Sequence, residues 1–115
     1  MKKVYSNIIP PSSMKAVTLW PLLFIHYDVK FTLTDERHEE IHGRQQLECL
    51  IVLFYLLYGL FYLIGLVCYR SHKMAYRNIP FESEAYMNER KPTYLEKRRL
   101  FAWVKYIGKT TYKTA

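Results

Sequence analysis

The dominant feature of the hydrophobic pattern is an uncharged stretch from Cys49 to Tyr69. It contains 21 residues without an acidic or basic side chain, and Glu48 and Arg70 flank it. That length meets the usual requirement of about 20 apolar residues for a membrane-spanning helix. Two glycines and several tyrosines weaken this assignment, and Gly59 offers a place where a helix can break. We therefore expect either a membrane segment or an apolar helical hairpin over residues 48–70.

Ahead of this stretch, the pattern predicts a small amount of sheet. Residues 1–15 are polar and interrupted by prolines, so we expect an irregular arm there. The run over residues 16–25 is rich in strand formers, and its Pro21 is tolerated only at a sheet edge or a bulge, which predicts one edge strand. Alternation over residues 26–34 favours a second, half-exposed strand, so that residues 16–34 form a strand or hairpin.

The rest of the chain is expected to be helical. Thr34 can act as an N-cap, and acidic residues follow it, so a helix is predicted over residues 35–47. After a basic connector, the proline at position 80 marks the start of a Glu-bearing helix over residues 80–90. The Thr93-x-x-Glu96 spacing resembles a capping box and predicts a C-terminal amphipathic helix over residues 93–107.

Composition and charge bound the size of the core and the partners of the chain. A chain of 115 residues fits a single domain over residues 1–115, whose small core needs support from a metal, a partner or lipid. The formal charge of +7 suits an anionic lipid surface. We expect no nucleic-acid partner, because the basic residues form no recognisable reading motif. The two cysteines indicate neither a disulfide framework nor a CxxC metal site, and no cleavable signal peptide is predicted.

A candidate zinc site lies in the predicted helix over residues 35–47. The sequence there reads His38-Glu39-Glu40-Ile41-His42, an HExxH motif. A spacing of four places both histidines on one helix face, about 6 Å apart, so that both can bind one Zn²⁺. Glu39 then lies beside the metal, where it can act as a general base and later protonate the leaving amine.

Catalytic zinc has three protein ligands and one open position, so the motif needs a third ligand. The downstream sequence reads Glu82-Ser83-Glu84-Ala85-Tyr86. Together the two motifs resemble those of small gluzincin metallopeptidases, which follow HExxH with an ExxxD helix, written ExEAD in several small families. The resemblance implies that Glu82 is the third ligand, with Glu84 as the fallback. It also puts Tyr86 where the family has an aspartate that orients a histidine, and a tyrosine cannot supply that carboxylate.

Several neighbouring segments resemble small uncharacterised membrane-associated proteins of Bacteroidota. The segments that carry this resemblance are residues 18–21, 42–46, 75–82 and 101–106. The resemblance covers residues 16–107 and implies a shared architecture and a bacterial cytoplasmic membrane, without indicating a substrate. In zincins generally, an edge strand beside the active-site helix binds an extended peptide. Residues 19–24 are expected either to play that part or to form a plain packed strand.

The zinc and membrane expectations conflict unless the apolar stretch bends. If it crossed the bilayer as one helix, His42 and Glu82 would lie on opposite sides of a hydrocarbon layer about 30 Å thick. They could not then share a metal ion. The zinc hypothesis therefore requires a break, which we predict at Tyr58-Gly59, and contact with the membrane without crossing it.

The sequence thus predicts an α+β, mostly helical, minimal zincin-like domain with an N-terminal edge strand and an apolar helical hairpin. Its predicted function is that of a membrane-associated zinc metallopeptidase, whose partners are a peptide or protein substrate and membrane lipid. Two alternatives remain open. One is a single-pass structural or accessory membrane protein without chemistry, and the other is a purely structural zinc site.

Overall fold

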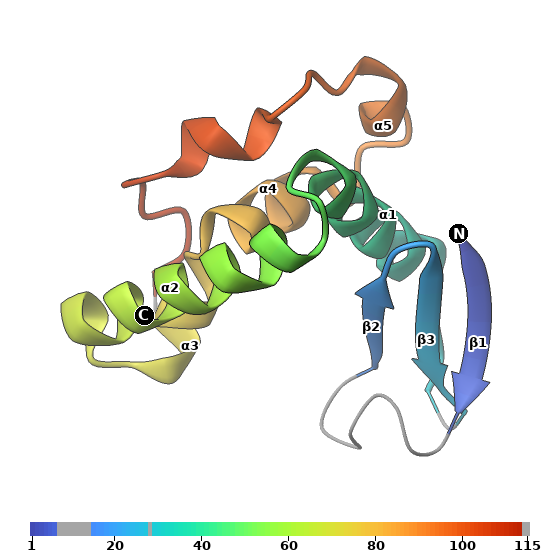
Figure 1. The fold of residues 1–115 in the computed structure, drawn as a ribbon, viewed down its shortest axis with the longest axis horizontal. Helices are drawn as coiled ribbons and strands as arrows, with labels where there is room; N and C mark the ends of the chain where they lie inside the picture. Colours follow the sequence, from blue (N-terminus) through green and yellow to red (C-terminus); the bar gives the residue numbers. More distant parts are fainter. Residues whose placement is uncertain (7–14, 28, 114–115) are drawn as a thin grey trace.

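The computed structural model describes residues 1–6, 15–27 and 29–113, and it has the predicted α+β, mostly helical fold (Figure 1). A small sheet lies at one end of the molecule and the helices lie at the other. Helix α1, Leu33–Glu48, lies between the two parts, because it packs on strand β2 as well as on helices α2 and α4. Both halves of the molecule therefore meet at the helix that carries the HExxH motif.

The sheet contains three strands in the order β1-β3-β2. Strand β3, Leu22–His26, is central; β1, Lys2–Ser6, pairs with it in parallel and β2, Ala16–Leu19, pairs with it antiparallel. The irregular arm expected over residues 1–15 is therefore wrong for β1, while residues 7–14 lie outside the described part. Strand β1 reads Lys-Lys-Val-Tyr-Ser, and none of its residues is fully buried, which suits an edge strand and explains why its composition resembled that of a loop.

Two further expectations for the N-terminal half are corrected. The predicted single strand over residues 16–25 is two strands, because the chain turns at Trp20-Pro21. The second strand expected over residues 26–34 is absent from the described residues there, since β3 ends at His26 and α1 begins at Leu33. Thr32 caps α1, and a reciprocal capping box joins it to Asp35. Thr34 has no acidic residue three positions later, which is the signal that distinguishes the two threonines.

The apolar stretch forms one continuous helix, α2, Val52–Tyr69, so the predicted break at Tyr58-Gly59 is wrong. The chain bends instead before α2, where Leu50 and Ile51 have φ values of 56° and 55°. A glycine inside a helix costs only about 1 kcal/mol relative to alanine, so Gly59 does not by itself end the helix. The reversal of direction needed to bring residues 38–42 close to residue 82 is thus made at the α1–α2 junction.

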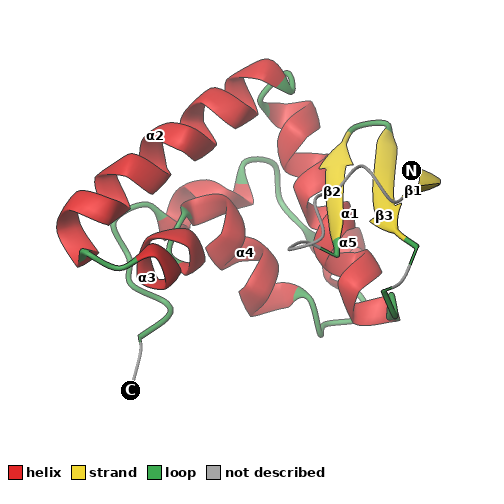
Figure 2. Ribbon diagram, turned by 90° about the horizontal axis from the view of Figure 1, so that it is seen from below, coloured by secondary structure: helices red, strands yellow, loops and turns green. Residues whose placement is uncertain are grey.

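Helix α2 lies along the other helices with one face and exposes the opposite face (Figure 2). Its inner face contributes Phe54, Tyr58 and Tyr62 to an aromatic core that also contains Phe81 and Trp103. Among the described residues, this helix is the one long and apolar enough to cross a membrane by length and composition, and most of it is exposed in the structure. It does not separate His42 from the helix that carries Glu82, since Tyr58 itself contacts Glu82.

The C-terminal half contains the predicted Glu-bearing helix and three shorter ones. Helix α4 is Pro80–Asn88, and the expected connector before it contains α3, His72–Arg77. The long helix expected over residues 93–107 is instead α5, Tyr94–Lys97, and the 3-10 helix η1, Ala102–Tyr106. The side chain of Thr93 makes no capping hydrogen bond. The helix is interrupted where Arg98 adopts an extended conformation and binds buried carboxylates.

Candidate metal centre

The two histidines of the HExxH motif lie one helical turn apart on the buried side of α1. His38 and His42 are each only 7% exposed to solvent. Their ring centroids are 4.8 Å apart, and their Nε2 atoms are separated by 3.1 Å. The i, i+4 spacing therefore directs both Nε2 atoms to one point, as the sequence predicted.

Glu82 reaches the same point from α4. Its Oε1 atom lies 3.2 Å from the Nε2 atom of His38 and 3.1 Å from that of His42. Tetrahedral zinc at about 2.0–2.1 Å from each ligand would separate two ligand atoms by about 3.4 Å, which is close to the spacing observed here. The structure thus brings together the three side chains that the sequence proposed as ligands.

The second nitrogen of each imidazole is occupied by a protein oxygen. The Nδ1 atom of His38 lies 2.8 Å from Oε2 of Glu89, and Nδ1 of His42 lies 2.8 Å from Oε1 of Gln45. A neutral imidazole that donates from Nδ1 presents a lone pair at Nε2, which is the form that binds a metal. Both rings are therefore oriented with the correct atom towards Glu82.

Glu39 lies beside these ligands, but its carboxylate is not one of the three groups whose atoms meet there. Thr18 on β2 donates a hydrogen bond of 2.7 Å to its Oε1 atom, so the sheet fixes this carboxylate. A buried group of His38, Glu39 and His42, with ligand atoms within 4.8 Å of one another, could hold a metal ion. Of these two carboxylates, it is Glu82 that lies within hydrogen-bonding distance of both imidazoles.

The charges and the burial of the clustered side chains shift their pKa values. Burial alone would lower the pKa of His38, but hydrogen bonds to Glu82 and Glu89 outweigh burial and raise it to about 10. Burial is likewise outweighed at His42, whose pKa is raised by Glu82, and at Glu82, whose pKa is lowered by the two histidines. For Glu39, burial dominates and raises the pKa of the carboxyl group. A raised pKa suits a carboxylate that must accept and return a proton.

The fallback ligand Glu84 serves a different purpose in the structure. It is fully buried, and Arg98 contacts both of its oxygens, at 2.6 and 3.0 Å. It also accepts hydrogen bonds from Tyr94 and from Gln45, the residue that orients His42. Glu84 therefore lies in an ion-pair network behind the centre, and Gln45 connects it to His42.

Tyr86 contacts His38 through its ring rather than through a carboxylate. The two ring centroids are 4.5 Å apart, in an edge-on arrangement. The carboxylate that the gluzincin pattern would supply from this position comes instead from Glu89, which sequence reasoning missed. Glu82 and Glu89 are seven residues apart, or about two helical turns, so both project from the same side of the chain. The seven-residue spacing from Glu82 was therefore the sequence signal that could have identified Glu89.

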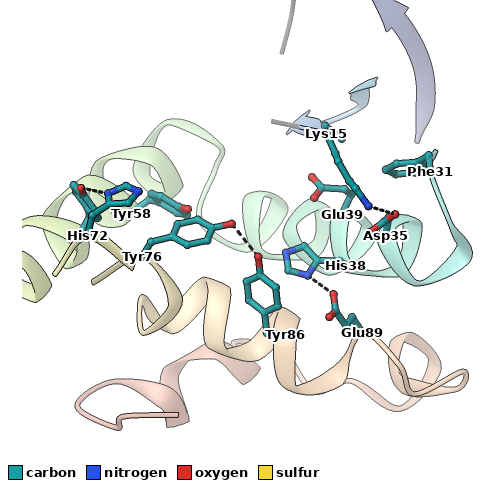
Figure 3. Close-up of a pocket in the computed structure, with 12 residues that line it drawn as sticks. Lys15, Phe31, Asp35, His38, Glu39, Tyr58, His72, Tyr76, Tyr86 and Glu89 are labelled. Carbon is teal, nitrogen blue, oxygen red and sulfur yellow. Dashed lines mark hydrogen bonds and ion pairs between the residues drawn. The ribbon is translucent and has the colours of Figure 1, made fainter. Parts of the chain in front are cut away.

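A cavity of about 770 Å³ opens beside the centre (Figure 3). Charged groups line one side of it, whereas the side formed by α2, α3 and α4 is aromatic; its lining includes Lys15, Asp35, His38, Glu39, Glu89, Tyr58, Tyr62, His72, Tyr76 and Tyr86. A smaller cavity of about 210 Å³ adjoins it, since both are lined by His38 and Glu39; we call it the inner cavity because His42 and Glu82 also line it. The candidate metal centre therefore lines the smaller of two adjoining cavities.

The edge strand expected beside the centre is β2, not residues 19–24. Leu19 ends β2, whereas Leu22 begins the central strand β3. Gln46 of α1 fixes the end of β2, donating to the carbonyl oxygen of Thr18 and accepting from the backbone N–H of Trp20, both at 2.7 Å. The edge of β2 that does not pair with β3 therefore runs beside Glu39 and the inner cavity.

Comparisons with known proteins add no independent assignment to this geometry. The chain matches no family model, no curated protein and no solved structure. The resemblance to gluzincins accordingly rests on the residues of the two motifs and on the chemistry of the side chains around them.

Proposed function

We propose that this chain is a membrane-associated zinc metallopeptidase. The observation that carries the proposal is the convergence of His38 Nε2, His42 Nε2 and Glu82 Oε1 within 3.1–3.2 Å of one another, at the end of a cavity. Two imidazoles and one carboxylate form the ligand set of many catalytic zinc sites in peptidases. Both Nδ1 atoms are held by other residues, so the ligand atoms are already oriented.

Zinc held by these three side chains would supply Lewis-acid chemistry, by acidifying water and polarising a peptide carbonyl group. Glu39 supplies the proton transfers. Its carboxylate takes a proton from the attacking water as the C–O bond forms, and it gives that proton to the amine nitrogen as the C–N bond breaks. Thr18 holds one carboxylate oxygen through the 2.7 Å hydrogen bond, so this base keeps its position through both transfers.

The substrate class is supported by the strand beside the centre. Peptidases commonly bind an extended peptide by adding it to a sheet edge, where backbone hydrogen bonds give affinity without a specific sequence. Strand β2 presents such an edge next to Glu39. Its first residue, Ala16, and the preceding Lys15 line the larger cavity, whereas Gln46 and Tyr55 already occupy the carbonyl oxygen of Thr18 further along the strand. A peptide lying along β2 would place its backbone across the metal position.

The membrane part of the proposal rests on α2. Its exposed side chains form a single apolar stripe at helical spacing: Leu53, Leu56, Leu60, Leu63, Ile64 and Val67, each 48–77% exposed. A stripe of this size is costly in water and marks a contact surface. Because the opposite face of α2 packs on the core, we propose that lipid covers the stripe alone, at a bacterial cytoplasmic membrane.

A structural zinc site is the second candidate. The ligands are almost fully buried, and a chain of this size gains folding free energy from a bound metal. This candidate makes Glu39 dispensable, because a structural site needs no proton acceptor. The two functions therefore differ in the effect of one side chain.

The test is metal content and peptide hydrolysis of full-length protein purified in mild detergent. We expect one zinc ion per chain, and we expect His42→Ala and Glu82→Ala to lose it. Glu36→Ala is the matched control, because Glu36 lies on the same helix and forms a partly exposed ion pair with Lys3. Hydrolysis is measured on a mixture of quenched fluorescent peptides.

Glu39→Gln separates the candidates, since it should keep zinc and lose hydrolysis. Zinc binding without hydrolysis in the wild-type protein would favour the structural site. No zinc in the wild-type protein would refute both candidates, and it would leave the non-enzymatic membrane protein as the better account.

A further inference from the structure

Two turns of the chain each present a leucine to solvent. Leu50 lies between α1 and α2, and Leu100 lies just before η1; both are 80% exposed, more than any other large hydrophobic residue in the described part of the chain. The backbone is unusual at both turns, because Leu50 and Ile51 have φ values of 56° and 55°, and Phe101 has a φ value of 56°. Non-glycine residues in this left-handed region are strained, so other contacts must hold both turns in place.

A single buried carboxylate holds the two turns together. Glu48, two positions before Leu50, accepts two hydrogen bonds of 2.9 Å from Arg98, two positions before Leu100. It also accepts a 2.6 Å hydrogen bond from the backbone N–H of Phe101. The side chains of Arg98 and Glu48 are only 3% and 5% exposed. A buried ion pair thus fixes two strained turns side by side, with their leucines held in solvent rather than in the core.

The apolar surface continues along η1. Phe101, Val104 and Ile107 are each 47–49% exposed, and they are spaced three residues apart. A 3-10 helix has three residues per turn, so these side chains form one row, which we call the outer row of η1. Trp103 is buried in the same aromatic core as Leu57 of α2, so η1 lies against α2 with its outer row exposed.

The charges around this surface indicate what covers it. Residues 97–109 contain five basic residues and no acidic one. Arg98 is used in the buried ion pair. The other four are exposed, and none of them forms an ion pair with a residue that the structure describes: Lys97, Arg99, Lys105 and Lys109. Apolar side chains interleaved with free cations suit a bilayer with anionic headgroups, where the former enter the acyl boundary and the latter contact phosphate.

We propose that the two turns and the outer row of η1 form a membrane anchor that inserts into the interface of an anionic bilayer. Leu50 and Leu100 enter the acyl boundary, while Arg99 and Lys105 contact lipid phosphate groups. The inference rests on the membrane association proposed above. Of α2 itself, lipid covers only the exposed stripe, and the anchor adds a second contact through other segments.

The anchor is connected to the candidate metal centre. Arg98 also pairs with Glu84, which accepts a hydrogen bond from Gln45, the residue whose Oε1 atom lies 2.8 Å from Nδ1 of His42. Insertion of the anchor would therefore fix the position of the metal centre relative to the bilayer, through buried contacts rather than through a flexible linker.

The test is co-sedimentation of full-length, detergent-depleted protein with phosphatidylcholine vesicles, prepared with and without phosphatidylglycerol. The first variant combines Leu50→Asn with Leu100→Ser; asparagine is chosen because it tolerates positive φ. Its matched control combines Leu33→Ser with Tyr27→Ser, which removes two side chains, 77% and 62% exposed, from outside the anchor. Chemical denaturation checks that each variant folds.

A second pair of variants tests the cations. Arg99→Gln with Lys105→Gln removes two charges from the anchor, and Lys2→Gln with Lys30→Gln removes two exposed charges near the sheet as the control. If the cations contact phosphate, the anchor variant loses affinity for vesicles that contain phosphatidylglycerol and keeps its affinity for phosphatidylcholine alone.

We expect the leucine variant to bind both kinds of vesicle about 25-fold more weakly, or roughly fivefold for each leucine. The charge variant should bind anionic vesicles about 25-fold more weakly at low salt. Both controls should change binding by less than about threefold, because salt screens charges that lie more than a Debye length of about 10 Å from the lipid.

Three results would overturn the anchor while leaving the contact of α2 with lipid in place. These are vesicle binding that the leucine variant leaves unchanged, anionic binding that the charge variant leaves unchanged, and a lipid-free dimer that the leucine variant converts to a monomer. The last result would assign the turns to a contact between two copies of the chain. Wild-type protein that binds neither kind of vesicle would refute the membrane association itself, and the anchor with it, without affecting the metal centre.

Discussion

Glu89 and His38 are joined by a 2.8 Å contact between Oε2 and Nδ1, which fixes the orientation of the first histidine of the HExxH motif. The contact links the end of α4 to the first half of α1. Arg37 strengthens this link, because its guanidinium donates a 2.7 Å hydrogen bond to the backbone carbonyl of Glu89. A position outside the usual gluzincin spacing therefore supplies the carboxylate that Tyr86 lacks.

The first prediction concerns this carboxylate. Glu89→Gln keeps an acceptor of similar shape but removes the charge that makes the imidazole a stronger ligand. We expect zinc affinity to fall about 10- to 100-fold, as for other partners that orient a metal-binding histidine. Competition with a chromophoric chelator measures it. Glu36→Gln on α1 is the control, and an unchanged affinity in Glu89→Gln would mean that Tyr86 alone suffices to hold the ring.

The second prediction concerns the buried ion pairs behind the centre. Arg98 contacts Glu84 and Glu48, and its side chain is only 3% exposed. Arg98→Met leaves two buried carboxylates without their cation, so we expect a loss of about 3–5 kcal/mol in the free energy of unfolding. Arg99→Met, at the exposed neighbouring position, should change it by less than about 0.5 kcal/mol. Chemical denaturation measures both, and equal stabilities would contradict the role of Arg98.

The third prediction is a pH dependence of the metal-free protein. The pKa of His38 is raised from 6.5 to about 10 by its carboxylate partners, despite burial. The protonated form is therefore favoured by folding. Its stabilisation is fully present below about pH 6.5, and it is lost as the pH rises towards 10. Thermal unfolding in EDTA should show lower stability at pH 9 than at pH 6.5.

Two comparisons check the origin of this effect. His38→Gln should reduce the pH dependence and leave the part that comes from His42, whose pKa Glu82 also raises. Excess zinc should reverse its sign in the wild-type protein, since a metal competes with protons for Nε2 and binds more tightly as pH rises. A metal-free protein that becomes more stable towards pH 9 would contradict the prediction.

The fourth prediction contrasts two glycines of α2. A Cβ atom added at Gly59 meets nothing within 4 Å, whereas one added at Gly65 lies 3.0 Å from the Cα atom of Ala75. Gly59→Ala should therefore stabilise the protein by up to about 1 kcal/mol through helix propensity. Gly65→Ala should destabilise it, because the backbone of α3 must move. Denaturation in detergent measures both, and a loss of stability in Gly59→Ala would revive the idea of a hinge at this position.

The sequence indicated which side chains come together better than it indicated the elements that hold them. HExxH and its downstream glutamate are local patterns, and the i, i+4 spacing fixes geometry within one helix. The bend at Leu50 and Ile51 could not be read in this way, because non-glycine residues seldom adopt positive φ. It depends on how α1 and α2 pack in the folded chain.

The split of the C-terminal helix was hidden for a similar reason. Its local pattern favours a helix, but Arg98 reaches Glu48, fifty positions away in the sequence. Long-range ion pairs of this kind override local propensity, and a single sequence does not reveal them. The same applies to Thr18, which fixes Glu39 from the sheet.

The last prediction tests the lipid contact of α2. Leu56, Leu60 and Leu63 are 66%, 51% and 60% exposed on one stripe. If this stripe enters a bilayer, each leucine contributes about 1 kcal/mol of apolar transfer free energy. The triple change to serine should then weaken binding to vesicles that contain anionic lipid roughly a hundredfold. Co-sedimentation of detergent-depleted protein with the vesicles measures it.

Leu33→Ser is the control, because Leu33 is 77% exposed at the end of α1 that lies away from the α1–α2 junction. High salt separates the two contributions, since it screens the attraction between the positively charged chain and the lipid but not the apolar transfer. Binding that salt abolishes and the leucine changes leave intact would show a purely electrostatic surface contact. The stripe on α2 would then have to be covered by something other than lipid.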